Sequence, residues 1–265
     1  MRPVLGTYVE VAAHAGPAAE AAIEAAFASL HDSHARWSFH EPDSELSQLN
    51  RQPGVELALS RSSLRLLRLA RAMTVASGGL FNCTVGGELV RRGLLPGHGP
   101  GPAIAVGVAD DLQLTHGTAR LRRPVRITLD GIAKGYAVDL AVQAMRRAGV
   151  CSGWVNAGGD LRVFGDAELP VQRREAHGGL TPLGRLRAAA LASSQTGLAS
   201  ASFPGCIVGA PAGAAQVVSV MAHSAWRADA LTKVAAAAAP EERAALVARL
   251  GGHWVGGAAD ARRAA

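Results

Sequence analysis

The chain has 265 residues, of which 49% are hydrophobic and 4% are aromatic, and its formal net charge is +6 at pH 7. A chain of this length can bury most of its unfolded surface in one large domain or two small ones. No run reaches the ~18 consecutive apolar residues that a membrane-spanning helix requires, which argues against a membrane span and predicts a soluble, globular protein.

The basic residues are scattered along the chain and are not gathered in a tract with interleaved aromatic residues. This distribution argues against a nucleic-acid-binding protein. Only two of the 27 basic residues are lysines, Lys134 and Lys233. We therefore expect a compact ammonium group, in place of a planar guanidinium, to matter at both positions, with chance placement as the alternative.

The cysteines Cys83, Cys151 and Cys206 are odd in number, far apart and without C-x-x-C spacing. They predict neither a zinc site nor a disulfide framework, and they fit a reducing compartment. Met1 leads directly into a strand-like run, without a signal-peptide core or a lipid-attachment cysteine. A cytoplasmic protein is predicted, with a missing upstream segment as the alternative.

Alternating apolar residues predict an early strand over residues 5–11, and Pro17 is expected to start an alanine-rich helix. The polar stretch 37–50 predicts a loop that closes in a short helical turn, for which Ser44 is a suitable cap.

A second helix is predicted from about Ser63 to Ala76, where two glycines end it. The glycine-bounded residues 79–87 predict an irregular segment where the backbone can approach a ligand closely. The Pro- and Gly-rich residues 96–102 predict a flexible loop inside the domain.

The central stretch, residues 128–139, follows an alternating apolar run over residues 125–129 that predicts a half-buried strand. Apolar residues at helical spacing then continue to Gly149. The expected order is strand, tight glycine turn and helix N-terminus. Free N–H groups, the positive end of a helix dipole and Lys134 together predict an anion site, most simply for phosphate.

Beyond the central helix, residues 154–165 predict two strands joined by a glycine bend, for which a plain hairpin is a sufficient explanation. Residues 166–185 are polar and show no clear pattern. A buried strand is predicted over residues 217–221.

A helix is predicted from Ala228 to Pro240, with Asp229 in its first turn, followed by another helix that ends at Gly251. The carboxylate of Asp229 is explained either by the helix dipole or by a metal site with a hydroxyl and a lysine three and four residues later. Residues 257–265 predict a disordered tail.

Considered alone, the central stretch is neither a P-loop nor a G-x-G-x-x-G motif. The residues themselves support a phosphate-bearing ligand at the turn from Asp130 to Lys134. A hard divalent cation recruited by Asp229 fits the same region, and magnesium suits a site made of one carboxylate and phosphates.

Six segments, in this order, resemble the conserved blocks of the ApbE family, the FAD:protein FMN transferases. They are residues 5–7 (LGT), 42–50 (PDSELSQLN), 79–85 (GLFNCTV), 130–136 (DGIAKGY), 155–160 (VNAGGD) and 228–231 (ADAL). The resemblance covers residues 5 to about 235.

The resemblance implies a single α+β, T-fold-like domain over residues 1–256, with mixed or antiparallel sheets and packed helices. It also implies that FAD is bound and that magnesium assists cleavage of its pyrophosphate. FMN is then joined to a threonine of a partner flavoprotein, and AMP leaves. This is metal-assisted phosphoryl transfer.

Position by position, the resemblance implies FAD contacts from Leu5, His40, Leu80, Phe81 and Asn82, beside Asp130 and Lys134 of the turn. It implies metal ligands at Gly131, through a backbone carbonyl, and at Asp229. A second metal side chain, typically a threonine, is expected four residues after Asp229. That position holds Lys233, so either Thr232 reaches the metal or Lys233 partly replaces it.

Two further positions depart from the family pattern. Asn82 stands where an aspartate is frequent, which makes a charged contact neutral. Residues 205–213 (GCIVGAPAG) lack the Ser-His-Ile-x-Asp-Pro-x-Thr-Gly block, whose histidine is expected to act as general base. A general base contributes roughly 10²- to 10⁴-fold in rate. The resemblance makes an FMN transferase the first hypothesis. The missing block favours the alternative, a flavin-binding protein that holds FAD without transfer or hydrolyses it to FMN and AMP.

Overall fold

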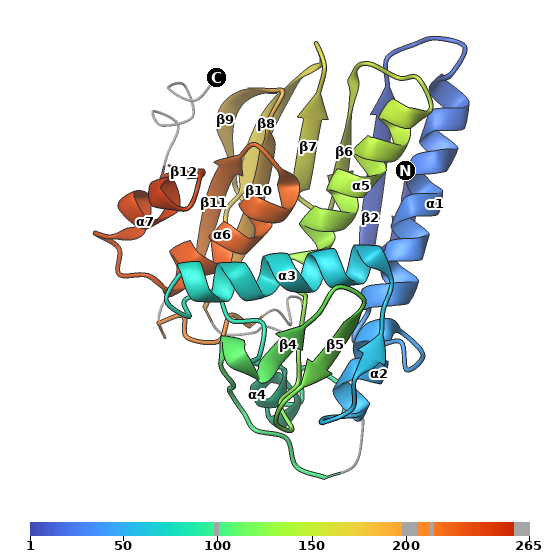
Figure 1. Cartoon of the computed structure of the whole chain (residues 1–265). Helices are drawn as coiled ribbons and strands as arrows, with labels where there is room; N and C mark the ends of the chain where they lie inside the picture. The colour runs from blue at the N-terminus through green and yellow to red at the C-terminus, as the bar shows by residue number, and fades with distance from the viewer. Residues whose placement is uncertain (98–100, 198–205, 212–214, 257–265) are drawn as a thin grey trace.

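A seven-stranded sheet forms the centre of the computed structural model, which describes residues 1–97, 101–197, 206–211 and 215–256 (Figure 1). Its order is β1-β2-β6-β7-β10-β11-β12, and neighbouring strands are antiparallel. The strands are β1 (Arg2–Val4), β2 (Thr7–Ala13), β6 (Gly153–Ala157), β7 (Asp160–Phe164), β10 (Ala190–Thr196), β11 (Gln216–Ala222) and β12 (Gly252–Val255).

Both faces of this sheet are covered. The helices α1 (Ala19–Trp37), α5 (Ala133–Arg147) and α6 (Ala225–Ala237) pack on one face, and α7 (Arg243–Arg249) lies beside β12 (Figure 1). The hairpin of β8 (Glu168–Arg174) and β9 (Leu180–Arg187) covers the other face, where its apolar residues form a second, smaller core with β7, β10, β11 and β12. Strand β7 is therefore buried on both sides.

A second layer lies at the end of the sheet. It contains α2 (Glu45–Arg51), α3 (Arg61–Ala76), α4 (Gly86–Arg91), a 3₁₀ turn (Ala109–Asp111) and the small sheet β3-β5-β4, with β3 (Leu57–Ala58), β4 (Leu112–Leu114) and β5 (Thr118–Leu121). Helix α3 runs across the ends of α5 and α6 (Figure 1). Residues between the two layers are thus contributed by distant parts of the chain.

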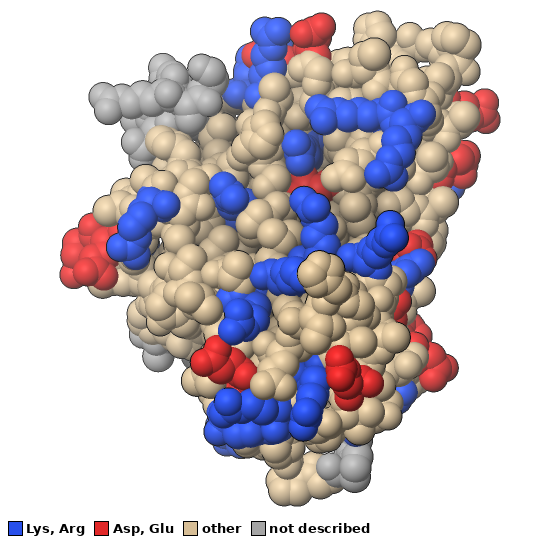
Figure 2. Space-filling view, viewed as in Figure 1, with Lys and Arg blue, Asp and Glu red and all other residues tan. Residues whose placement is uncertain are grey.

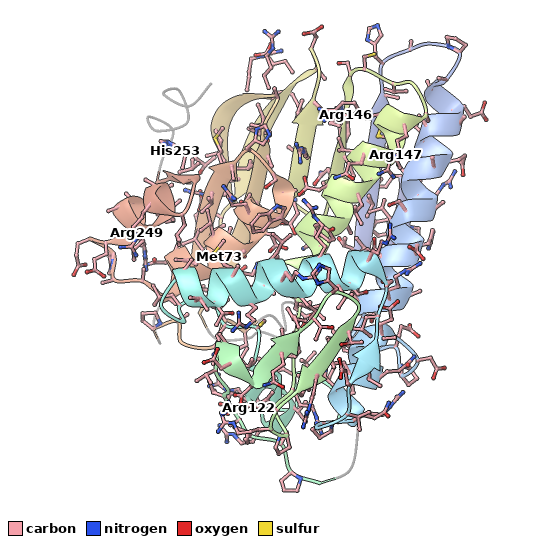
Figure 3. All side chains as sticks on the ribbon, viewed as in Figure 1. Met73, Arg122, Arg146, Arg147, Arg249 and His253 are labelled. Carbon is pink, nitrogen blue, oxygen red and sulfur yellow. The ribbon has the colours of Figure 1, made fainter. Side chains whose placement is uncertain are left out.

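Basic side chains are distributed over several elements. Figure 2 shows Lys and Arg side chains spread over the visible face with acidic groups among them. Figure 3 places Arg146 and Arg147 at the end of α5, Arg122 after β5 and Arg249 on α7. The expectation that the chain does not bind nucleic acid stays a prediction. No helix in the described part of the chain is long and apolar enough to cross a bilayer.

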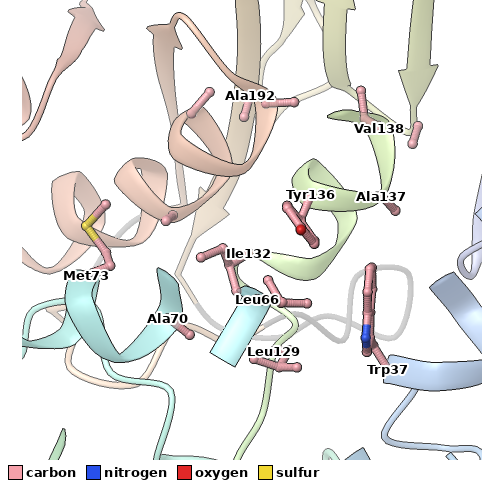
Figure 4. Close-up of a cluster of buried hydrophobic side chains, with 14 of the residues drawn as sticks. Trp37, Leu66, Ala70, Met73, Leu129, Ile132, Tyr136, Ala137, Val138 and Ala192 are labelled. Atoms are coloured by element: carbon pink, nitrogen blue, oxygen red, sulfur yellow. The ribbon is translucent and has the colours of Figure 1, made fainter. Parts of the chain in front are cut away.

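The contact between the layers is apolar and tightly packed. Leu66 of α3 lies beside Ile132 and Tyr136 at the start of α5, and Met73 lies at the other end of α3, on the side of α6 (Figure 4). Beside them, the ring centroids of Trp37 and Tyr136 lie 5.4 Å apart. These contacts hold the beginning of α5 in place, because α5 cannot shift without opening both the sheet core and the layer contact.

Two features fix α6 against α5. Gly135 lies at their closest approach, where an added Cβ would be 2.3 Å from the carbonyl oxygen of Ala225. The buried carboxylate of Asp139 accepts the N–H groups of Ala225 and Trp226, both at 3.0 Å, and also pairs with Arg162. Asp139 therefore caps α6 from a neighbouring helix, where the N-cap residue Ser224 makes no side-chain cap of its own.

Several sequence predictions are confirmed. The α+β class holds, and every strand pair among the described residues is antiparallel. Ser44 caps α2 by accepting the N–H of Ser47 at 3.0 Å. The predicted hairpin is β6 and β7, whose turn residues Gly158 and Gly159 have φ of +59° and +101°. The predicted tail, residues 257–265, lies outside the described residues.

The predicted strand over residues 125–129 is wrong. This segment is buried but pairs with no strand. The side chain of Asn50 takes the place of a partner strand: its Oδ1 accepts the N–H of Ile127 at 2.7 Å, and its Nδ2 donates to the carbonyl of Ile127 at 2.8 Å. The apolar alternation was real, but a side-chain amide satisfies the backbone there.

Three other predictions need correction. The early strand does not begin at Leu5, because Leu5 and Gly6 form the turn between β1 and β2, with φ of +57° and +70°. Residues 166–185 contain most of the β8–β9 hairpin, whose strands are too exposed to show an apolar pattern. Helix α6 begins at Ala225, so Asp229 lies in its second turn and not its first.

Candidate functional site

A cavity of about 300 Å³ lies between the two layers, at the N-terminal end of α5. The apolar part of its lining consists of Leu80, Phe81, Val85, Leu89, Leu94, Leu95, Ile207 and Val208. The polar part includes the side chains of Thr128, Asp130, Lys134, Asp160, Ser193, Ser194, Gln195 and Lys233. A ligand with an apolar ring and an anionic group fits this division.

A second cavity, also of about 300 Å³, borders the same turn at Asp130. Leu5 and His40 line it together with Trp37 and Phe39. Asp130 and Lys134 line both cavities. The structure thus brings the predicted residues of three distant segments together around one turn, with room for a ligand in both cavities.

The turn itself is built from local hydrogen bonds. The N–H groups of Ile132 and Ala133 donate to the carbonyl of Leu129 at 2.9 and 2.7 Å, and the hydroxyl of Thr128 donates to Asp130 at 3.0 Å. Helix α5 begins at Ala133 without a side-chain cap. Its positive end therefore faces the region that both cavities share, as the anion-site prediction requires.

Lys134 is held beside a buried carboxylate. Its Nζ lies 3.3 Å from Oδ2 of Asp160, whose side chain is 4% exposed. Burial, and next the charge of Asp229, raise the pKa of Asp160 to about 6, and the charge of Asp160 in turn raises the pKa of Lys134. Asp160 therefore loses its proton at a higher pH than an ordinary aspartate does.

Asp160 was not among the predicted site residues, although it lies in the quoted block 155–160. The sequence signal was an acidic residue directly after the Gly158-Gly159 bend. The hairpin returns the chain at this point, so the first residue of β7 reaches the N-terminus of α5. Without the hairpin and the helix in place, nothing local distinguishes Asp160 from a turn residue.

The side chains of Asp229, Thr232 and Lys233 form a closed network. Nζ of Lys233 donates to Oδ1 of Asp229 at 2.6 Å, to Oγ of Ser194 at 2.9 Å and to Oγ1 of Thr232 at 3.2 Å. The other Asp229 oxygen, Oδ2, accepts the N–H of Gly135 at 3.1 Å. Thr232 donates to the carbonyl of Asp229 at 2.7 Å and lies 2.7 Å from Ser194.

This network does not fit the expected magnesium ion. Oδ1 of Asp229 and the hydroxyl of Thr232 share the ammonium of Lys233 as their partner, and Oδ2 of Asp229 accepts the N–H of Gly135. Gly131 is adjacent, but the stem of Lys233 lies over it: an added Cβ would be 3.3 Å from its Cγ and Cε. Of the two alternatives for this position, the geometry favours the replacement by Lys233 over a metal contact from Thr232.

Asn82 lines the cavity, yet its amide is committed to the protein. Its Oδ1 accepts the N–H and the hydroxyl of Thr84 at 2.9 and 2.7 Å, and its Nδ2 donates to the carbonyl of Gly107 at 3.1 Å. Asn82 therefore shapes the loop, while Leu80 and Phe81 provide apolar surface toward a ligand.

The segment that departs from the family pattern reaches the same cavity. Cys206 lines it, and Nη1 of Arg92 lies 3.2 Å from its sulfur. Among the described residues, no histidine lines this cavity; His40 belongs to the second one. Of residues 205–213, positions 205, 212 and 213 lie outside the described residues.

Known proteins resemble this chain in sequence. Residues 5–196 match the model of the ApbE family. A curated relative, the FAD:protein FMN transferase of Rhodobacter capsulatus, is 33% identical over 181 residues, which cover 62% of this chain and 34% of that protein. The chain thus aligns with about a third of that relative's length.

Solved structures share the fold. The ApbE protein of Thermotoga maritima superposes with a TM-score of 0.79 at 21% identity, covering 96% of this chain and 91% of that one. The flavinyl transferase ApbE of Pseudomonas stutzeri, in its apo form, gives a TM-score of 0.71 at 18% identity and covers 94% of both chains. With the family model matched over residues 5–196, the chain belongs to the ApbE family.

Proposed function

We propose that this chain transfers FMN from FAD to a threonine of an acceptor flavoprotein and releases AMP. The observation that carries the proposal is the turn at Asp130 and Lys134, which borders both an apolar cavity and a second cavity. FAD has the matching chemistry: a central diphosphate with a ring system on either side. The name of the Rhodobacter capsulatus relative supports the same reaction.

The reaction balances as a phosphoryl transfer. The threonine oxygen attacks the phosphorus of the FMN half, and the bond from that phosphorus to the bridging oxygen breaks. AMP leaves with the bridging oxygen. Lys134 and the N-terminal end of α5 stabilise the charge on the diphosphate, because both are fixed before the ligand binds. Asp160, with a pKa of about 6, is ionised at neutral pH and can accept the hydroxyl proton.

Magnesium has no part in this proposal. Two of the residues expected to hold it, Asp229 and Thr232, bind the ammonium of Lys233, and the stem of Lys233 lies over the third, Gly131. The side chains of the chain itself therefore supply the positive charge at the diphosphate.

A second function is favoured by one observation. The described lining of the main cavity contains Cys206 where the family pattern has a histidine, and no other histidine replaces it. A chain that lacks this base would hold FAD without transfer, or would hydrolyse it to FMN and AMP. The apolar lining and Lys134 serve binding in either case.

The test is incubation of the purified chain with FAD and an acceptor domain that carries a target threonine, with and without magnesium, followed by mass spectrometry. Covalent FMN on the acceptor supports transfer. FAD bound without an adduct refutes transfer and supports the binding protein, while AMP released without an adduct supports hydrolysis.

A matched pair of variants tests the site. Lys134→Ala should weaken FAD binding tenfold or more, because a charge-assisted contact to phosphate is lost. Arg147→Ala removes an exposed basic side chain at the other end of α5 and should leave binding unchanged (Figure 3). Equal effects of the two substitutions would remove the anion site from α5.

A further inference from the structure

Lys233 has the environment of a bound cation and not of a surface lysine. Its ammonium has three N–H donors, and three side-chain oxygens lie within 2.6 to 3.2 Å of Nζ. Its side chain is 22% exposed, and it lines the main cavity. The chain contains one other lysine, Lys134, which lines the same cavity.

The acceptors of Lys233 are also committed to it. The Asp229 carboxylate, 1% exposed, divides its oxygens between this ammonium and the N–H of Gly135. A divalent cation that used Asp229 would have to displace the ammonium, because two cations on one carboxylate repel each other strongly in a buried position. The stem of Lys233 also packs over Gly131, where an added Cβ would lie 3.3 Å from its Cγ and Cε.

We propose that the ammonium of Lys233 is the built-in cation of this cavity, so that the chain binds a diphosphate without a divalent metal ion. A phosphate oxygen would take the place of the Thr232 hydroxyl, which is the longest of the three contacts at 3.2 Å. A lysine suits this role because its ammonium is a compact point charge. The choice of FAD as the diphosphate rests on the function proposed above.

The experiment measures FAD affinity by quenching of flavin fluorescence, in excess EDTA and in excess magnesium. The wild-type chain should bind FAD with the same affinity, within about twofold, in both conditions. A loss of tenfold or more in EDTA that magnesium restores would overturn the proposal.

The variant Lys233→Thr places a hydroxyl where the ammonium was and frees the Asp229 carboxylate. Its FAD affinity should fall at least tenfold in EDTA and recover in magnesium, a dependence that the wild type lacks. Lys233→Met removes the charge without providing a ligand, so its affinity should fall in both conditions. Affinities of both variants equal to the wild type in EDTA would refute the role of Lys233.

Metal binding gives an answer that does not depend on variant folding. Manganese is titrated into the wild-type chain and into Asp229→Asn without FAD, and binding is followed by electron paramagnetic resonance. We expect the wild-type chain to have no manganese site that depends on Asp229, that is, no site that the substitution removes. Such a site would overturn the proposal. The outcomes also separate the two proposals: FAD binding in EDTA without an FMN adduct refutes transfer and leaves the Lys233 inference standing, whereas no FAD binding in either condition refutes both.

Discussion

The side chain of Asn50 should be among the most important polar groups for stability. It is fully buried, and its amide makes two hydrogen bonds to the backbone of Ile127, at 2.7 and 2.8 Å. The substitution Asn50→Ala removes both bonds and leaves an N–H and a carbonyl of the segment 125–129 without partners in the core.

The loss of stability follows from the two backbone groups that are left without hydrogen-bond partners. Each buried polar group that loses its partner costs about 1–3 kcal/mol, so the pair predicts a loss of about 4 kcal/mol. That is a large part of the 5–15 kcal/mol typical of a folded domain. The free energy of unfolding, measured by urea denaturation with an unchanged m-value, is the appropriate quantity.

Gln48→Ala is the matched control. Gln48 lies on the same helix, α2, and its amide donates to the carbonyl of Asp43 at 2.9 Å, but it is exposed. Its removal should change the free energy of unfolding by less than about 0.5 kcal/mol. If Asn50→Ala costs less than about 1 kcal/mol, the amide is not acting as a substitute for a strand and the reasoning fails.

Three further predictions concern α5 and its neighbours. Gly135→Ala should cost about 1–3 kcal/mol despite its better helix propensity, because the new Cβ would lie 2.3 Å from a carbonyl of α6. Gly117→Ala, which has open space, is the control in the same urea denaturation, and equal stabilities would contradict the clash. Asp139→Ala should lower the free energy of unfolding by about 3 kcal/mol, since two N–H groups of α6 and the partly buried Arg162 lose their acceptor. An unchanged melting temperature would show that Asp139 does not cap α6. FAD affinity should decrease as pH rises through about 6, where the raised pKa of Asp160 turns a neutral carboxyl into an anion beside the diphosphate; Asp160→Asn should remove this dependence, and a pH profile like that of the wild type would refute it.

Local interactions explain what could be predicted from the sequence. The cap at Ser44, the glycine bend at residues 158–159 and the start of a helix after Asp130 each depend on residues within a few positions of one another. The proposed anion site at Lys134 also depends on neighbours in sequence, because a helix N-terminus and a lysine in its first turn are adjacent along the chain. The resemblance of six ordered segments to the ApbE family predicted the fold and the flavin ligand.

Contacts between distant residues decided the rest. Asn50 and Ile127 are 77 positions apart, and only the packed structure shows that a side-chain amide replaces a strand. The β8–β9 hairpin was not predicted, because its strands are largely exposed and their sequence shows little alternation of apolar and polar residues.

The two lysines of the site show the same difference between what the sequence and the tertiary structure reveal. Their rarity was visible in the composition, and it pointed to both positions. What each lysine meets was not visible: Asp160 reaches Lys134 through the β6–β7 hairpin, and Ser194 reaches Lys233 through strand β10. The sequence by itself determined where the charges lie along the chain. Only the tertiary structure decided their partners, because burial and distance between remote segments set the energy of each charge.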